Sequence, residues 1–180
     1  MTRIKDVSLA GAVTRGEESW WQVTSPVLSQ IGQRAAGLDL RGLEVVCFQH
    51  VLLNSAPAIR ALARAGARVR VAAVNPDSTD DIAAAYLVRE RVEVWAWNGM
   101  TEAERIEGLD WLLREPADAL SDMGGELIAG AVERNFKPRG ALEATMSGLH
   151  RLAGLHLGFP VFNWNDVALK DRGGPTIANC

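Results

Sequence analysis

The sequence contains no apolar run of the roughly 18 residues needed to span a bilayer, so we expect no transmembrane helix. Residues 1–19 lack a continuous apolar segment, which argues against a secretory signal peptide. Cysteine is scarce, since Cys47 lies in an expected buried strand and Cys180 is the last residue. Two such thiols form no disulfide framework and indicate a reducing compartment, so we expect a cytoplasmic protein.

Strong charge and the common cofactor motifs are also missing. The net charge of −3 and the isoelectric point near 5.6 give no electrostatic case for binding nucleic acid or an anionic membrane. The three histidines are far apart and no two cysteines are close, so no metal-ligand spacing is visible. No GxGxxG or GxxxxGKS/T motif occurs, and the usual dinucleotide-binding and phosphate-binding fingerprints are therefore absent.

What the sequence does contain is an alternation of short apolar runs with helical stretches. Five apolar runs are predicted to be strands, namely residues 43–48, 68–74, 92–97, 118–122 and 159–164. Strands that alternate with helices of about 10 to 15 residues predict βαβ units with right-handed crossovers. We therefore expect an α/β fold, with a single open, mostly parallel sheet and helices on both faces, similar to Rossmann and flavodoxin folds.

We expect three regions along the chain. Residues 1–38 should form a helical segment that packs on the domain, residues 39–171 the α/β domain, and residues 172–180 an irregular tail. Residues 123–135 predict a turn entering a helix, and residues 141–155 predict a further helix. Helix caps are predicted at Ser78, with Asp81 three residues later, and at Thr101.

Polar residues gather where the predicted strands end, and ligands of such sheets bind beyond the carboxyl ends of the strands. These residues are Gln49, His50, Asn54, Asn75, Asp77, Ser78, Asn98, Thr101, Asp122, Met123, Gly124, Gly125, Asn165, Asp166 and Lys170. The set favours a small ligand with several hydrogen-bonding groups, such as a sugar or nucleoside. His50 is either a helix-capping side chain or an acid/base group, and the two glycines form either a tight turn or an anion nest.

Six blocks of the chain surround the predicted strand ends. The blocks are CFQHVLLNSA (47–56), NPDSTDDIAAA (75–85), VEVWAWNGMTEAE (92–104), LSDMGGEL (120–127), RGALEATMSGLHRL (139–152) and FPVFNWNDVALK (159–170). Taken together, they resemble the substrate-binding domain of the S-adenosylhomocysteine hydrolase family. The likeness extends from about Leu40 to Lys170.

The resemblance implies a role for several side chains. In the family, NAD held by a second domain oxidises the ribose 3′-hydroxyl, homocysteine is eliminated, water adds and the ketone is reduced again. His50 matches a histidine near the reacting carbon, and Lys170 matches a family lysine. Asp122 and Glu143 match the first members of an aspartate pair and a glutamate pair. The remaining matches to the substrate pocket are Asn54, Thr145, Asn165 and Asp166.

The second member of each acidic pair is replaced here, by Met123 and by Ala144. Methionine cannot transfer a proton, and alanine cannot bind a ribose diol, whereas a general acid or base contributes about 10²–10⁴-fold to a rate. The chain also ends before an NAD domain could begin, so we expect no cofactor in it unless a separate Rossmann domain supplies NAD.

We therefore expect a repurposed enzyme of specialised metabolism. It would use His50, Asp122 and Lys170 for NAD-independent elimination, hydrolysis or cyclisation of a nucleoside, thioether or sulfonium ligand. Met123 would line the ligand pocket. The alternatives are a non-catalytic ligand-binding module, or the substrate-domain part of a split or truncated hydrolase. Under any of these functions, the expected protein partners are a second copy of the chain or a separately encoded NAD-domain protein.

Overall fold

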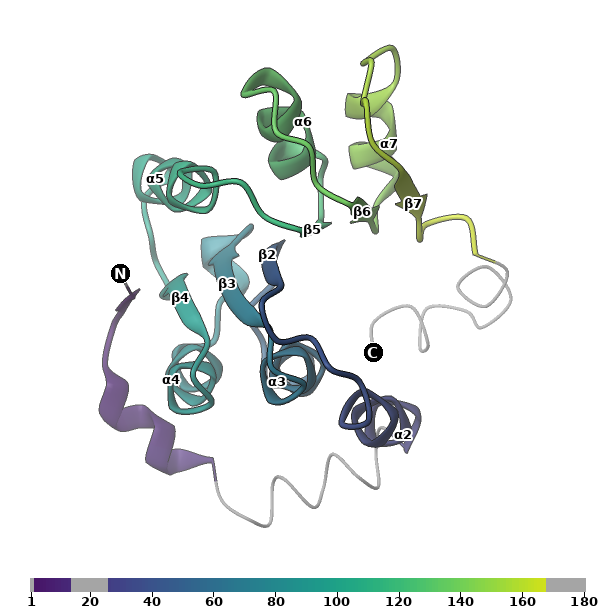
Figure 1. Ribbon diagram of the computed structural model, residues 1–180. Coiled ribbons are helices and arrows are strands. Elements are labelled where there is room, and N and C mark those ends of the chain that lie inside the picture. The colour runs from purple at the N-terminus through teal and green to yellow at the C-terminus, as the bar shows by residue number, and fades with distance from the viewer. Residues whose placement is uncertain (1, 14–25, 168–180) are drawn as a thin grey trace.

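One open sheet with helices on both faces makes up the computed structural model, which describes residues 2–13 and 26–167 (Figure 1). The strands are β1 (Arg3–Ile4), β2 (Glu44–Gln49), β3 (Arg68–Ala73), β4 (Glu93–Ala96), β5 (Ala119–Asp122), β6 (Gly140–Glu143) and β7 (Val161–Asn163). They lie in the order β1-β4-β3-β2-β5-β6-β7, and every neighbouring pair is parallel. The predicted α/β fold with a parallel sheet is confirmed.

The helices divide into two layers because the chain reverses direction across the sheet. The helices are α2 (Pro26–Ala35), α3 (Ala56–Arg64), α4 (Asp81–Arg89), α5 (Glu102–Leu112), α6 (Glu126–Glu133) and α7 (Met146–Leu152). Figure 1 shows α2, α3 and α4 on one side of the strands and α5, α6 and α7 on the other. From β2 the chain moves outward to β3 and β4, then returns through α5 to β5 on the other side of β2. The strand order therefore reverses between β2 and β5, the position where doubly wound sheets bind ligands.

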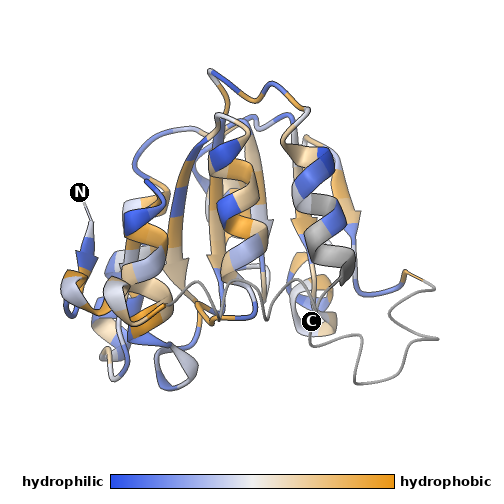
Figure 2. Ribbon diagram, turned by 90° about the horizontal axis from the view of Figure 1, so that it is seen from below, coloured by the Kyte–Doolittle hydropathy of each residue, from blue (hydrophilic) through white to orange (hydrophobic). Residues whose placement is uncertain are grey.

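The core lies between the sheet and the two helical layers. The central strands β2 and β3 are covered on both faces, and Val46, Val69 and Val71 are at most 1% exposed. The helices in Figure 2 carry apolar and polar residues side by side, as expected of helices with one buried face. Cys47 is buried as predicted, and burial raises the pKa of its thiol to about 12. Such a thiol remains protonated and unreactive at neutral pH.

Two strands were not predicted from the sequence. β6 occupies the start of residues 141–155, for which a helix was predicted, so that prediction is wrong before α7 begins. The N-terminal segment was predicted to be helical, but it contributes β1 and the 3-10 helix η1 (Val7–Ala12) before α2. β1 pairs with β4 at the edge of the sheet, and η1 packs against α4. Residues 14–25 and the predicted tail lie outside the described residues.

The helix caps were partly predicted. Thr101 caps α5 as expected, in a reciprocal capping box with Glu104. The cap of α4 is Asp80 and not Ser78, since the Asp80 carboxylate accepts the N–H groups of Ile82 and Ala83 at 2.8 and 3.2 Å. Ser78 is instead the last residue of the short 3-10 helix η2 (Pro76–Ser78). Its hydroxyl does not cap α4 and contributes to the strand-end site.

Neither a membrane span nor a metal cluster is found in the part of the chain that the structure describes. No helix there has both the length and the apolar character needed to cross a bilayer. Among the same residues, no three His, Cys, Asp or Glu side chains come together as ligands for a metal ion.

Candidate functional site

The carboxyl ends of the strands meet along one edge of the sheet because all the strands are parallel. At the reversal of strand order, Phe48 of β2 pairs with Asp122 of β5. The next residue of β2, Gln49, donates a side-chain hydrogen bond across the reversal to the Ser121 hydroxyl. The structure thus places His50 and Met123, which follow β2 and β5, on the two sides of the reversal.

The loop that carries His50 is held by hydrogen bonds on both sides. Ser55, directly before α3, donates its hydroxyl to the carbonyl of His50 at 2.8 Å. Its oxygen also accepts the N–H of Leu52 at 3.1 Å. From the neighbouring loop, the N–H of Asp80 donates to the carbonyl of Val51 at 2.9 Å. These bonds fix the position of the His50 backbone relative to β2 and α4.

A short chain of hydrogen bonds orients the His50 ring. Its Nδ1 lies 2.8 Å from the Ser78 hydroxyl, and that hydroxyl donates to the carbonyl of Asn75 at 3.3 Å. In the tautomer in which Nδ1 donates to this hydroxyl, Nε2 carries the lone pair of the ring. Burial lowers the pKa of the half-buried His50, which favours the neutral ring. A neutral ring with an available Nε2 has the properties of a general base.

The turn that carries Ser78 is braced from the end of β4. Asn98 donates its side-chain amide to the carbonyls of Asp77 and Thr79 at 3.3 and 3.2 Å. Its backbone N–H donates to the Asp81 carboxylate at 2.8 Å. Asn98 is therefore a supporting residue of the candidate site, connecting the end of β4 with the turn that orients His50.

The two retained acids, Asp122 and Glu143, are fully buried. Asp122 Oδ2 accepts the N–H of Ile128 in the first turn of α6 at 2.9 Å. Burial raises the pKa of Asp122 to about 7, the charge of Glu143 adds to the rise, and backbone hydrogen bonds oppose it. The Asp122 side chain lies beneath α6 and is not open to a ligand. The catalytic role predicted for Asp122 stays a prediction.

Glu143 binds the turns on either side of it. Its Oε1 accepts the backbone N–H and the hydroxyl of Thr145 at 2.7 and 2.6 Å, and the N–H of Gly124 at 3.1 Å. The hydroxyl of Thr145 also accepts the N–H of Gly148, which caps α7. Glu143 and Thr145, both predicted to contact a ligand, thus hold the backbone of the strand ends in place.

The replaced acid positions lie at the surface of the same strand ends. Met123 and Ala144 are both half-buried. Their neighbours Asp122 and Glu143, the last residues of β5 and β6, are by contrast fully buried. The structure therefore separates buried retained acids from accessible positions where methionine and alanine stand.

The other predicted binding residues lie farther along the edge. Asn54 is exposed in the turn before α3. Asn165 and Asp166 form a turn after β7, in which the Asp166 carboxylate accepts the side-chain amides of Asn163 and Asn165 at 2.6 and 2.8 Å. Lys170 lies outside the described residues. Ser121, which bonds Gln49, was not predicted, although its place one residue before the end of β5 was a signal for it.

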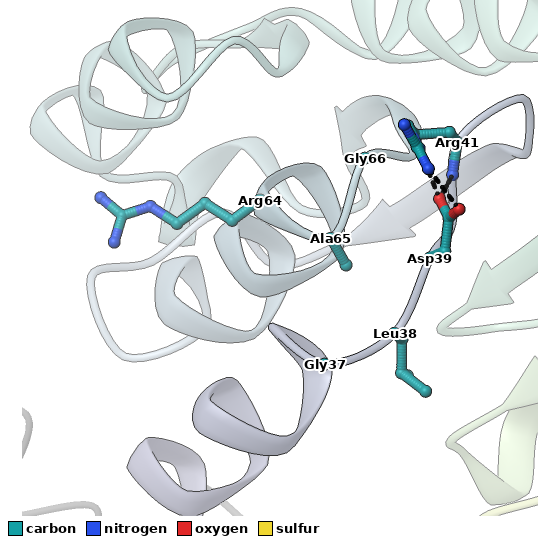
Figure 3. A pocket seen from close by; sticks show the side chains of 7 residues that line it. All are labelled: Gly37, Leu38, Asp39, Arg41, Arg64, Ala65 and Gly66. Atoms are coloured by element: carbon teal, nitrogen blue, oxygen red, sulfur yellow. Dashed lines mark hydrogen bonds and ion pairs between the residues drawn. The ribbon is translucent and has the colours of Figure 1, made fainter.

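A cavity of about 340 Å³ lies at the opposite, amino-terminal end of the strands (Figure 3). It is bordered by the loop before β2 and by the end of α3. The charged groups at its rim are already paired, since Arg41 binds Asp39 at 2.7 Å and Arg64 binds Glu90 at 2.8 Å. This cavity is therefore distinct from the strand-end residues that the sequence singled out.

Together, the fold and the strand ends define a doubly wound α/β domain with a candidate ligand site at its switch point. The family model described as S-adenosyl-L-homocysteine hydrolase matches residues 2–135. The chain belongs to the S-adenosyl-L-homocysteine hydrolase family.

Curated relatives share about a third of their residues with this chain. The S-inosyl-L-homocysteine hydrolase of Methanopyrus kandleri is 35% identical, over 93% of this chain and 41% of the relative. The adenosylhomocysteinase of Sulfolobus acidocaldarius is 31% identical, over 93% of this chain and 42% of the relative. The S-inosyl-L-homocysteine hydrolase of Methanosarcina mazei is 34% identical, over 84% of this chain and 39% of the relative. The chain therefore spans about two fifths of the length of these relatives.

Proposed function

We propose that the carboxyl edge of the sheet binds a small nucleoside-type ligand and that His50 acts on it as an acid/base group. The observation that carries this proposal is the orientation of His50 at the strand reversal. Its Nδ1 lies 2.8 Å from the Ser78 hydroxyl, and in the tautomer with a proton on Nδ1 the Nε2 atom is an acceptor. Ligands of doubly wound sheets bind at this reversal, and a neutral imidazole suits proton transfer near neutral pH.

Thioethers of a nucleoside with homocysteine are the ligand class we favour. The relatives are named for hydrolysis of S-inosyl-L-homocysteine or are adenosylhomocysteinases. Both purine bases are therefore candidates, and the related sulfonium compounds belong to the same class. The apolar side chains of Met123 and Ala144 support a ligand, or a reacting part of it, that is less polar than the ribose diol of adenosine.

The turn after β2 does not have the features of a dinucleotide-binding turn. The turn after β2, residues 50–55, contains no glycine, and its Val51 is fully buried, so it offers no close backbone approach for a pyrophosphate. We therefore derive no step through NAD within this domain. The proposed chemistry is elimination, hydrolysis or cyclisation with acid/base help from His50. Lys170 is proposed as a further acid/base group on the family resemblance.

A turnover assay tests the catalytic part of the proposal. The protein is incubated with S-adenosylhomocysteine, S-inosylhomocysteine or S-adenosylmethionine, and the products are quantified by liquid chromatography. The variant His50→Ala should reduce turnover by about 10²–10⁴-fold. The control His150→Ala, on the exposed surface of α7, should react like the wild type. Equal rates for His50→Ala and wild type would exclude the proposed role of His50.

A second candidate function is that of the substrate-domain part of a larger hydrolase. Its support is the coverage of only about two fifths of the relatives' length. Under this function the protein binds the nucleoside ligand but turns it over only with a separate NAD-binding protein. Ligand binding without turnover in the assay above would favour this function, or a binding module, over the repurposed enzyme.

A further inference from the structure

Two fully buried carboxyl groups lie side by side at the ends of β5 and β6. Asp122 and Glu143 are partners in the strand register. Partners in a parallel sheet point to the same face, so both side chains lie on the face that α6 and α7 cover. The hydrogen bonds agree, since Asp122 accepts from Ile128 of α6 and Glu143 accepts from Gly124 just before it.

Each of the two carboxyl groups has one oxygen that accepts hydrogen bonds and one oxygen without a hydrogen-bond partner. Asp122 Oδ2 and Glu143 Oε1 accept the hydrogen bonds described above. Asp122 Oδ1 and Glu143 Oε2 are buried and have no hydrogen-bond partner among the described residues. A buried oxygen without a donor is costly, and two buried negative charges in adjacent register positions repel each other.

The nearby arginine and histidine side chains bind other residues. Arg105 of α5 lies over the Phe48 ring but pairs with Glu102 and with Glu126 of α6, both at 2.7 Å. Arg151 of α7 also pairs with Glu126, at 3.2 Å. On the strand side, His50 follows β2 and bonds Ser78. Among the described residues, no Arg, Lys or His forms an ion pair with either buried carboxyl group.

We propose that Asp122 and Glu143 hold one proton between them, as an acid–carboxylate pair that fixes the turns carrying Met123 and Thr145. A single proton removes one of the two negative charges. It also supplies an O–H donor between the two oxygens that have no hydrogen-bond partner. Glu143 Oε1 then remains the acceptor for Gly124 and Thr145, whose backbone shapes the ligand edge. Asp122 and Glu143 are thus positioning residues, and this inference goes beyond the proposed function because it depends on no ligand.

The pair makes stability depend on pH in a defined direction. The pKa of Asp122 is about 7 in the folded protein against an ordinary value of 3.8, so the folded state binds the extra proton between these values. Stability from this group is present at low pH, falls as the pH rises toward 7 and is constant above it. The unfolding constant should therefore rise about tenfold per pH unit in this window because of this one proton.

Chemical denaturation of the wild type and of Asp122→Asn measures this proton. Asparagine keeps an acceptor for the Ile128 N–H and a donor toward Glu143, but it does not titrate. The ratio of the two unfolding constants should change about tenfold per pH unit between about pH 5 and pH 7 and then level off. Asp110→Asn, on the exposed surface of α5, is the matched control and should not reproduce this slope. A ratio that is independent of pH would overturn the proposal.

Infrared spectroscopy distinguishes a shared proton from a carboxyl group protonated by burial alone. At about pH 6 the wild type should show the C=O stretch of a protonated carboxyl group. Glu143→Gln should lose this band, since the amide supplies the donor and Asp122 can ionise. A wild type without the band, or a band that persists in Glu143→Gln, would contradict the shared proton. Because the band is first measured in the wild type, this part of the test does not require any variant to fold.

Discussion

Replacing Gly148 with alanine should lower the free energy of unfolding by about 3 kcal/mol. A Cβ at this position would lie 2.2 Å from the Glu143 carboxylate, far inside van der Waals contact. That carboxylate is buried and bonded to Gly124 and Thr145, so moving it leaves their N–H groups without an acceptor. The loss exceeds the gain in helix propensity from alanine, which is at most about 1 kcal/mol. Urea denaturation measures the difference.

A helical glycine with open space around it provides the control. Apart from its chain neighbours and the backbone of its own helix, nothing in the described part of the chain lies within 4 Å of a Cβ built at Gly32 of α2, so Gly32→Ala should be neutral or slightly stabilising. In the double variant Glu143→Ala with Gly148→Ala, the second substitution should cost much less than it does alone. Additive effects of the two substitutions would show that the Gly148 penalty does not come from the Glu143 carboxylate.

Restoring acids at Met123 and Ala144 should raise the affinity for a nucleoside about 100-fold. In Met123→Asp with Ala144→Glu, each new carboxylate can accept a hydrogen bond from a ribose hydroxyl. Hydrogen bonds to charged groups contribute about 1.5–3 kcal/mol each. Desolvation of the two carboxylates cancels about one of these contributions, and the other accounts for the gain in affinity. Both positions are half-buried at the strand ends, where a ligand would reach them. Calorimetric titration with adenosine and inosine measures the gain.

A ligand without the ribose diol separates this effect from general changes in charge. The gain should vanish with 2′,3′-dideoxyadenosine, which lacks both hydroxyls of the ribose diol and keeps only the 5′-hydroxyl. Met146→Asp adds an acid on the exposed surface of α7 and should leave the affinity for adenosine unchanged. An equal gain with the dideoxy ligand would mean that the acids do not contact the ribose.

The order of strands and helices could be predicted because apolar runs and turn residues alternate strongly from β2 to β5. β6 could not, since Gly140–Glu143 consists mainly of residues that favour helices and precedes a true helix. Pairing with β5 on one side and β7 on the other stabilises this segment as a strand. Such long-range pairing outweighs local propensity and is not visible in the residues themselves. β1, with two residues, is too short for any periodicity.

The strand-end edge could also be predicted, but the orientation of its side chains could not. The sequence order places Asp122 and Met123 at one strand end without showing which of them lies beneath a helix. That is decided by the position of α6, whose Ile128 N–H meets the Asp122 carboxylate. The partner of His50 depends likewise on the η2 turn, which brings Ser78 within 2.8 Å of the ring.

We have proposed that the carboxyl edge at the reversal of β2 and β5 binds a nucleoside-type ligand. Calorimetric titration of the wild-type protein with adenosine, inosine and S-adenosylhomocysteine is the direct test of this binding. We predict saturable binding of at least one of the three with one site per chain, and loss of that binding in Ala144→Trp, where the indole fills the edge. No heat of binding from any of the three ligands, or binding that Ala144→Trp leaves unchanged, would contradict the claim.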